Sequence, residues 1–266
     1  MRLSPFVLVG FALTTFAVPG APSRALADPP VDPPGAPKSS VKSEVTALLK
    51  QATGAYKQMK SYRHTALYVL EGKNPTTGET VKRETRYTLA LERPNRFAYK
   101  NDSRPQGSAV SDGKTFVNFR GGQTPQYTRQ KAPADFKGIN IVDDVVFEPL
   151  ATYVIALMLQ GDALADKDVR DAMEKATLKP GLVTENGKKW QVLVLPFGQQ
   201  DPTEIYFSTE DHLIGKAFQM GKVKISETIE SIRIDKPIEP TVFSYTLPES
   251  AKQIEKFVAP SRPNDA

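Results

Sequence analysis

The chain has 266 residues, of which 39% are hydrophobic and 24% are charged, and it contains no cysteine. These fractions argue against global disorder, collagen and coiled coils, and the missing cysteines exclude disulfides, thiolate zinc sites and cysteine nucleophiles. The formal charge of +5 is small and forms no long basic run, so we expect no nucleic-acid partner.

The N-terminal residues have the pattern of a secretory signal peptide. Arg2 precedes an apolar stretch over residues 5–18, Pro19 breaks it, and small residues lead up to Ala27. The stretch is shorter than the roughly 20 residues that a spanning helix needs. We expect residues 1–27 to be a signal peptide cleaved after Ala27, and the product to be soluble in the periplasm or secreted.

The rest of the chain divides by composition into three parts. Residues 28–40 are rich in proline and predict a solvated linker. Residues 259–266 are polar and predict a flexible tail. One folded domain is therefore expected over residues 41–258.

Periodicity predicts a helix first, then strands in runs. Ser40 can cap a helix over residues 41–60. Residues 80–92 alternate, so one face is largely apolar while Thr80, Lys82, Glu84, Arg86, Thr88 and Glu92 should face water. Asp112-Gly113 and Asn186-Gly187 are hairpin turns. The remaining predicted strands are 62–71, 96–100, 108–111, 114–119, 126–131, 181–186, 189–196, 203–208, 213–220 and 222–234, and the remaining helices are 144–160 and 166–176.

Because the strands come in runs instead of alternating with helices, the fold class is α+β with an antiparallel sheet. A sheet of about ten strands or more tends to curl. The concave side of a curled sheet needs filling, either by helices or by an apolar ligand.

Little in the sequence points to catalysis or metal binding. His64 lies in a predicted strand and His212 at a turn, without the helical partners typical of zinc sites. Nucleophile-elbow, zincin and phosphate-loop motifs are absent from the sequence. We therefore expect no enzyme activity, no metal and no cofactor.

The segment 149–160 contains no charged residue. A helix that is apolar nearly all round must be covered on most sides. It is either a central core helix or a helix that lines an apolar cavity, and the pattern leaves both open.

Four segments carry a family resemblance. The N-terminal helix leads into a strand at 62–70, Leu91–Phe97 reads LERPNRF, Val110–Phe119 reads VSDGKTFVNF, and Phe243–Ile254 reads FSYTLPESAKQI. In this order they resemble the LolA-like lipoprotein-carrier superfamily, and most closely an uncharacterised branch of predicted periplasmic proteins. The resemblance implies a strongly curved, unclosed antiparallel half-barrel with helices covering its concave face. It also implies a cavity that takes acyl chains.

The family uses an inward arginine, for which Arg83, Arg86 and Arg96 are candidates. Arg83 best fits the apolar side of its strand. Tyrosine hydroxyls and an arginine would orient a polar head group. The predicted ligand-binding residues are Tyr68, Arg83, Tyr87, Leu89, Phe97, Tyr99, Phe116, Val154, Met158, Phe207 and Phe218.

The function expected from these observations is an exported binding protein for a lipid, an acyl chain or another apolar ligand. An acylated protein could carry that group, and we expect a monomer that can contact a membrane or an envelope protein peripherally. The alternative is an envelope scaffold or sensing module that binds protein through a sheet face or edge and has no ligand. A third hypothesis, a hydrolase acting on envelope polymers, would need carboxylates clustered in a cleft.

Overall fold

A computed structural model describes residues 38–257 except 75, 102–106, 123, 142–148, 165 and 197–200, and only the backbone of residues 38–42 and 168. The expected signal peptide and tail, and all of the expected linker before residue 38, lie outside the described residues. The elements below belong to one compact unit, Pro37–Phe257.

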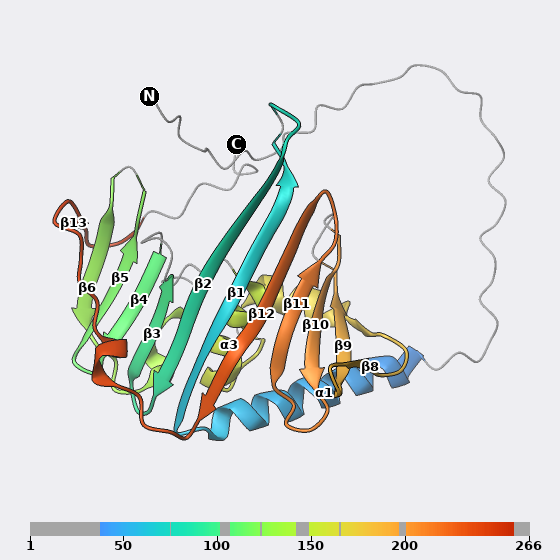
Figure 1. Ribbon diagram of the computed structural model, residues 1–266. Helices are drawn as coiled ribbons and strands as arrows, with labels where there is room; N and C mark the ends of the chain where they lie inside the picture. Colours follow the sequence, from blue (N-terminus) through green and yellow to red (C-terminus); the bar gives the residue numbers. More distant parts are fainter. Residues whose placement is uncertain are drawn as a thin grey trace, which may run out of the picture. The chain divides into compact units, whose positions relative to one another are not determined.

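The described residues form three α-helices, two 3-10 turns and thirteen strands (Figure 1). The helices are α1 (Lys38–Gln58), α3 (Leu150–Gln160) and α4 (Lys167–Glu174), and the 3-10 turns are η1 (Phe136–Gly138) and η2 (Pro240–Phe243). The strands are β1 (Ser61–Lys73), β2 (Thr80–Glu92), β3 (Arg96–Asn101), β4 (Gly107–Asp112), β5 (Thr115–Arg120), β6 (Gln126–Lys131), β7 (Thr177–Leu178), β8 (Val183–Glu185), β9 (Lys188–Leu195), β10 (Thr203–Ser208), β11 (Ile214–Gln219), β12 (Val223–Ile234) and β13 (Lys252–Gln253).

The strands form one large curved sheet that is not closed (Figure 1). Its order is β13-β6-β5-β4-β3-β2-β1-β12-β11-β10-β9-β7, with β8 paired to β9. Among the described pairs, β13 with β6 is parallel and the others are antiparallel. The expected α+β class with an antiparallel sheet is therefore confirmed. The first and last long strands, β1 and β12, pair in the middle of the sheet.

The main core lies between one face of the sheet and the helices. In β1 and β2, the pairs Tyr62–Leu91, His64–Leu89 and Ala66–Tyr87 place every second residue on this face. All six of these side chains are buried. α3 packs against α1 and β11, and each of its residues from Ala151 to Leu159 except Tyr153 is buried. This burial explains why α3 has no charged residue.

The opposite face of the sheet is also covered around β2, β3 and β4. There, Phe243 and Ile238 of the C-terminal segment pack on Ala90, Ala98 and Val110. We expected Thr88 to face water, but it is only 6% exposed. The expectation of a fully solvated second face was therefore wrong at this end of β2, because a segment about 150 residues further along the chain returns to cover it.

Two helix starts differ from the expected positions. α1 begins at Lys38, inside the expected linker, since serines are tolerated in the first turn and helix ends shift easily. Of the helix expected over residues 144–160, residues 144–148 lie outside the described residues. α3 begins at Leu150, because Pro149 precedes it in an extended conformation with φ −82° and ψ 126°. Proline has no N–H to donate and restricts the residue before it, so it suits a helix start better than a helix interior.

Candidate functional site

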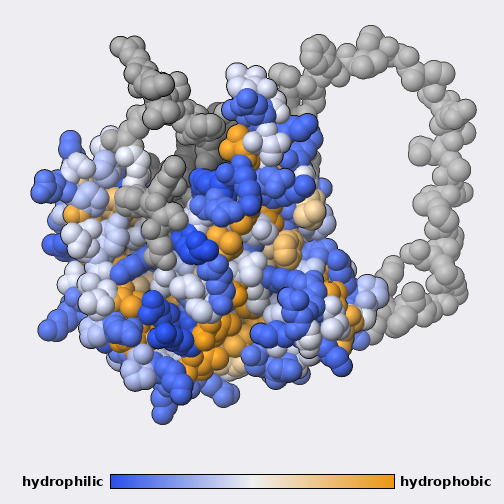
Figure 2. Space-filling model, viewed as in Figure 1, coloured by the Kyte–Doolittle hydropathy of each residue, from blue (hydrophilic) through white to orange (hydrophobic). Residues whose placement is uncertain are grey.

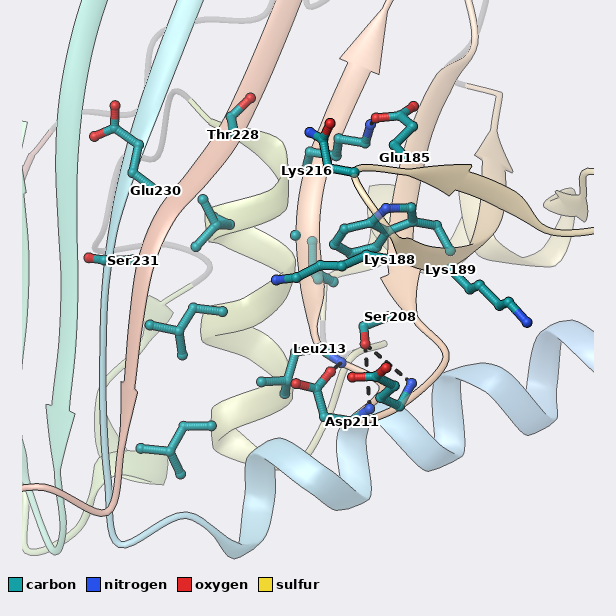
Figure 3. Close-up of a pocket in the computed structure, with 18 of the residues that line it drawn as sticks. Glu185, Lys188, Lys189, Ser208, Asp211, Leu213, Lys216, Thr228, Glu230 and Ser231 are labelled. Atoms are coloured by element: carbon teal, nitrogen blue, oxygen red, sulfur yellow. Dashed lines mark hydrogen bonds and ion pairs between the residues drawn. The ribbon is translucent and has the colours of Figure 1, made fainter.

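A cleft opens between β11 and β12, with a volume of about 760 Å³ (Figure 3). One wall is the second half of β12, and the other is formed by the start of β11 with the hairpins that β8, β9 and β10 make beside it. Ligand-binding clefts in proteins usually enclose about 300–1,000 Å³. The size of this cleft is within that range.

The wall from β12 is apolar. Ile229, Ile232 and Ile234 line the cleft, are half-buried, and pack against the main core. Leu213 and Ile214 face them from the β11 side. Figure 2 shows apolar side chains gathered over this half of β12. The core therefore reaches the surface at this cleft.

The cleft exists because β11 and β12 pair over a short distance. Their register covers Lys216–Gln219 against Ile225–Thr228. Beyond Thr228, β12 continues to Ile234 paired with β1. The register of β12 with β1 shifts between Thr65 and Ala66, and bulges of this kind bend a strand and increase its twist. The two strands consequently diverge, and a gap opens in the sheet.

Side chains accept hydrogen bonds from two backbone N–H groups around the start of β11, where β12 has moved away. The N–H of Ile214 donates to the Tyr56 hydroxyl of α1 at 3.0 Å. The N–H of Leu213 donates to Asp211 Oδ1 at 3.1 Å (Figure 3). At the start of β11, the N–H of Ile214 is therefore bonded to a side chain instead of to β12.

Trp190 borders the cleft and lies over Gly215. A Cβ at position 215 would overlap the Trp190 ring, so only glycine leaves room for the indole there. Trp190 is the only tryptophan in the chain. Its fluorescence can therefore report directly on the cleft.

Beside Trp190, a lysine is enclosed by aromatic rings. The Nζ of Lys216 lies 4.3 Å from the ring centroid of Tyr206 and 5.2 Å from that of Phe218, and it forms an ion pair with Glu185. The Tyr206 hydroxyl donates to Glu204, and burial, with this carboxylate nearby, raises the pKa of Tyr206 to about 12. Because its ammonium is already paired with Glu185 and packed against Tyr206, we assign Lys216 a structural role at the edge of the cleft.

Lys188 is available for a ligand. It extends from the start of β9 across the cleft towards β12 (Figure 3). It makes no ion pair with any residue that the structure describes. Three of the four acids that line the cleft are engaged, since Glu230 pairs with Arg86, Glu185 pairs with Lys216, and Asp211 accepts from the N–H of Leu213. The fourth acid that lines the cleft is Glu210. The cleft therefore combines an apolar wall with an uncommitted cation.

Behind the cleft, a buried carboxylate fixes α3 to β12. Glu227 is 1% exposed and accepts from the N–H of Ala151 at 2.7 Å, the N–H of Thr152 at 2.8 Å and the hydroxyl of Thr152 at 2.5 Å. A carboxylate at a helix N-terminus is favoured by the free N–H groups and by the helix dipole. Burial outweighs these donors and raises the pKa of Glu227 from 4.5 to about 7.

A chain of buried hydrogen bonds leads away from this carboxylate. Thr152 Oγ1 lies 3.1 Å from His64 Nε2, and His64 Nδ1 lies 2.9 Å from the Tyr62 hydroxyl. Tyr62 is in turn hydrogen-bonded to Tyr56. Because Thr152 donates to Glu227, its oxygen accepts from His64 Nε2–H, and Nδ1 accepts from Tyr62. Burial lowers the pKa of His64 to about 3, so the ring is neutral. This network joins α1, β1, α3 and β12.

The structure brings most of the predicted ligand-binding residues together in the main core. All but two of them are buried in this one cluster: Tyr68, Tyr87, Leu89, Phe97, Tyr99, Phe116, Val154, Met158 and Phe207. Arg83 is half-buried and faces Leu70 across the β1–β2 pair. Phe218 lies instead at the cleft, where its ring packs edge-on against Tyr206.

The sequence patterns did not identify Ile229, Ile232 and Ile234 as a site, nor Glu227 as a buried group. The bulge in β12 breaks strict alternation between Ile229 and Ile232. A usable signal was present for Glu227, because it stands between Ile225 and Ile229 at a spacing of two and must share their face.

Within the described ranges, no three His, Asp or Glu side chains are placed to hold a metal ion. No helix among the described residues is long and apolar enough to cross a membrane.

A family model matches the first half of the folded unit. Residues 46–153 match the family DUF2092, described as predicted periplasmic protein. The expected resemblance to an uncharacterised branch of predicted periplasmic proteins is confirmed by this match. The expected periplasmic location is confirmed with it. No curated protein matches the sequence.

The solved structures that match this chain have low sequence identity to it. An uncharacterized conserved protein from Thermus thermophilus is 10% identical with a TM-score of 0.45, over 79% of this chain and 98% of that chain. A LolA superfamily protein from Nitrosomonas europaea is 8% identical with a TM-score of 0.32, over 76% and 97%. The complex of MucA and MucB from Pseudomonas aeruginosa includes a chain that is 14% identical with a TM-score of 0.34, over 76% and 61%. All three TM-scores are below 0.5, so these likenesses carry no argument about function.

Proposed function

We propose that this periplasmic protein binds a lipid, an acyl chain or another apolar group, and that the cleft between β11 and β12 is where the group enters. The observation that carries the proposal is the half-buried wall of Ile229, Ile232 and Ile234, which continues into the main core. Each methylene that a ligand buries against such a wall contributes about 0.8 kcal/mol.

We further infer that the sheet is a half-barrel whose concave face is covered by α1 and α3. The bonds from Glu227 to the start of α3 and the packing of α1 on α3 support this arrangement. In this arrangement the predicted aromatic residues form the wall behind the cleft. The proposal assigns binding to the protein and no catalytic step.

The first test is native mass spectrometry of the protein purified from its own host, with lipid extraction of the same sample. A discrete co-purifying lipid or acylated species supports the proposal. A titration of the purified protein with dodecanoate follows, with the fluorescence of Trp190 as the signal. We expect saturable binding that shifts the emission to shorter wavelength, because the indole borders the cleft.

A pair of variants locates the binding. Ile232→Asp places a charge on the apolar wall and should weaken dodecanoate binding by at least tenfold. Val223→Asp is the matched control, since Val223 lies on the same strand, is 43% exposed and is outside the cleft. The proposal would be overturned by two results together. The protein purified from its host would show the mass of the ligand-free chain, and it would respond neither to dodecanoate nor to the peptide probe described below. Equal weakening by both variants would place the binding elsewhere.

A further inference from the structure

The second half of β12 is an open strand edge inside the sheet. From Ile229 to Ile234, β12 pairs with β1 on one side, and no described strand pairs with it on the other. In a strand, the N–H and C=O groups of alternate residues point to opposite sides. About half of the backbone groups in this stretch therefore face the cleft without a strand partner.

The two walls of the cleft differ in this respect. On the β11 side, the Tyr56 hydroxyl already accepts from the N–H of Ile214, the first residue of β11. On the β12 side, no side chain of the described residues is hydrogen-bonded to the backbone of Ile229–Ile234. A ligand that makes backbone hydrogen bonds would therefore pair with β12 and not with β11.

This difference selects among apolar ligands. A bare acyl chain would cover the β12 edge and leave its N–H and C=O groups unpaired, at a cost for each buried group. An extended peptide would pair with the same groups while placing every second side chain against the isoleucines. The backbone and the side chains of β12 both fit a peptide strand.

We propose that the cleft takes an extended segment of a partner protein, which adds to the β12 edge as a strand. Its side chains facing Ile232 and Ile234 are apolar, and its outward side chains are polar. An outward acidic residue would lie near Lys188, which crosses the cleft and has no ion pair with the described residues (Figure 3). This proposal rests on the proposed function, since the apolar group is here carried on a peptide.

The test uses a synthetic peptide as long as the open edge, with alternating valine and threonine and a glutamate at each end, acetylated and amidated. Two further versions carry N-methyl groups on one or the other set of alternate amides. Methylation removes the hydrogen-bond donor and keeps the side chains. Trp190 fluorescence measures binding of each peptide and, separately, of dodecanoate.

We expect the unmodified peptide to bind, one methylated version to bind at least tenfold more weakly, and the other to bind normally, because a single edge pairs with one set of amides. Equal binding of both methylated versions would show that side-chain burial alone drives binding, and would overturn strand addition while leaving the proposed function intact. Loss of binding with both methylated versions would overturn the assignment of the peptide to the single edge of β12. If dodecanoate binds and none of the peptides binds, the peptide partner is refuted. If neither dodecanoate nor the unmodified peptide binds, this proposal is refuted as well.

A variant pair adds an independent readout. Ile232→Thr keeps a β-branched side chain and removes apolar surface, so it should weaken binding of the unmodified peptide several-fold. Val223→Thr, on the same strand outside the cleft, should not. An equal effect of the two substitutions would contradict docking at the cleft.

Discussion

The buried carboxyl of Glu227 should make the stability of the fold depend on pH in an unusual direction. Burial raises the pKa of Glu227 from 4.5 to about 7 in the folded protein. A carboxyl whose pKa is raised by folding binds its proton more tightly in the native state than in the unfolded chain. Its contribution to stability is therefore fully present below pH 4.5 and is lost as the pH rises through about 7.

The size of the effect follows from the two pKa values. One pKa unit corresponds to about 1.4 kcal/mol, so the difference between 4.5 and about 7 corresponds to about 3 kcal/mol. His64 works in the opposite direction, because its pKa is lowered from 6.5 to about 3 and its contribution is lost as the pH falls through that range. Tyr62 and Tyr56, the other titratable groups of the network, have raised pKa values and stay neutral.

Because other groups also titrate, the test compares the protein with its Glu227→Gln variant. Urea unfolding at several pH values between about pH 4 and pH 8 gives the free energy of unfolding of each. We expect the stability advantage of the wild type over the variant to shrink by about 3 kcal/mol across this range. A constant difference would show that the three donors from Ala151 and Thr152 keep the carboxyl ionised throughout, and would refute the reasoning.

Substitutions at three further positions test individual contacts. Gly215→Ala should displace the Trp190 ring, because a Cβ at position 215 would overlap it. A red shift of the tryptophan emission should report this displacement, and unchanged emission would contradict the packing of Trp190 on Gly215. Tyr56→Phe should lower the free energy of unfolding by about 1–3 kcal/mol, because the buried N–H of Ile214 loses its acceptor, and no change in urea midpoint would argue against that bond. Asp166→Ala should cost about 1 kcal/mol by removing the cap of α4, measured in the same way, and Asp166→Asn should restore most of it.

Parts of the fold that obey local rules were predictable from the sequence. The period of two over residues 80–92 predicted β2, whose bounds are Thr80–Glu92. The Asn186-Gly187 pair predicted a tight hairpin, and both residues have positive φ, at 49° and 76°. Such turns need left-handed backbone conformations that asparagine and glycine adopt at low cost.

The cleft was not predictable in this way, because it depends on pairing between distant segments. Tyr56 and Ile214 are 158 residues apart, and their hydrogen bond replaces a strand contact that a local pattern would have assumed. The point at which β11 stops pairing, after Thr228 of β12, is set by register and bulges in three dimensions. Isoleucines in a strand look the same in sequence whether a neighbouring strand covers them or not.

The predicted ligand-binding residues show a related limit. Alternation over residues 80–92 put Tyr87 and Leu89 on the apolar face of their strand, and both are buried in the main core. Alternation does not say how completely a helix fills the space in front of that face. Val154 and Met158 of α3 are fully buried there, whereas the same core reaches the surface at the cleft, which is why we propose that a ligand enters at the cleft.

The arrangement of β12 explains how the core can be open on one side and still hold its helices. Glu227, in the part of β12 that pairs with β11, fixes the start of α3. Two residues further along, Ile229 begins the wall of the cleft. The anchor of α3 therefore does not depend on the half of β12 that pairs with β1 alone. A ligand or a peptide strand can occupy the edge from Ile229 to Ile234 without breaking the bonds that hold α3 to the sheet.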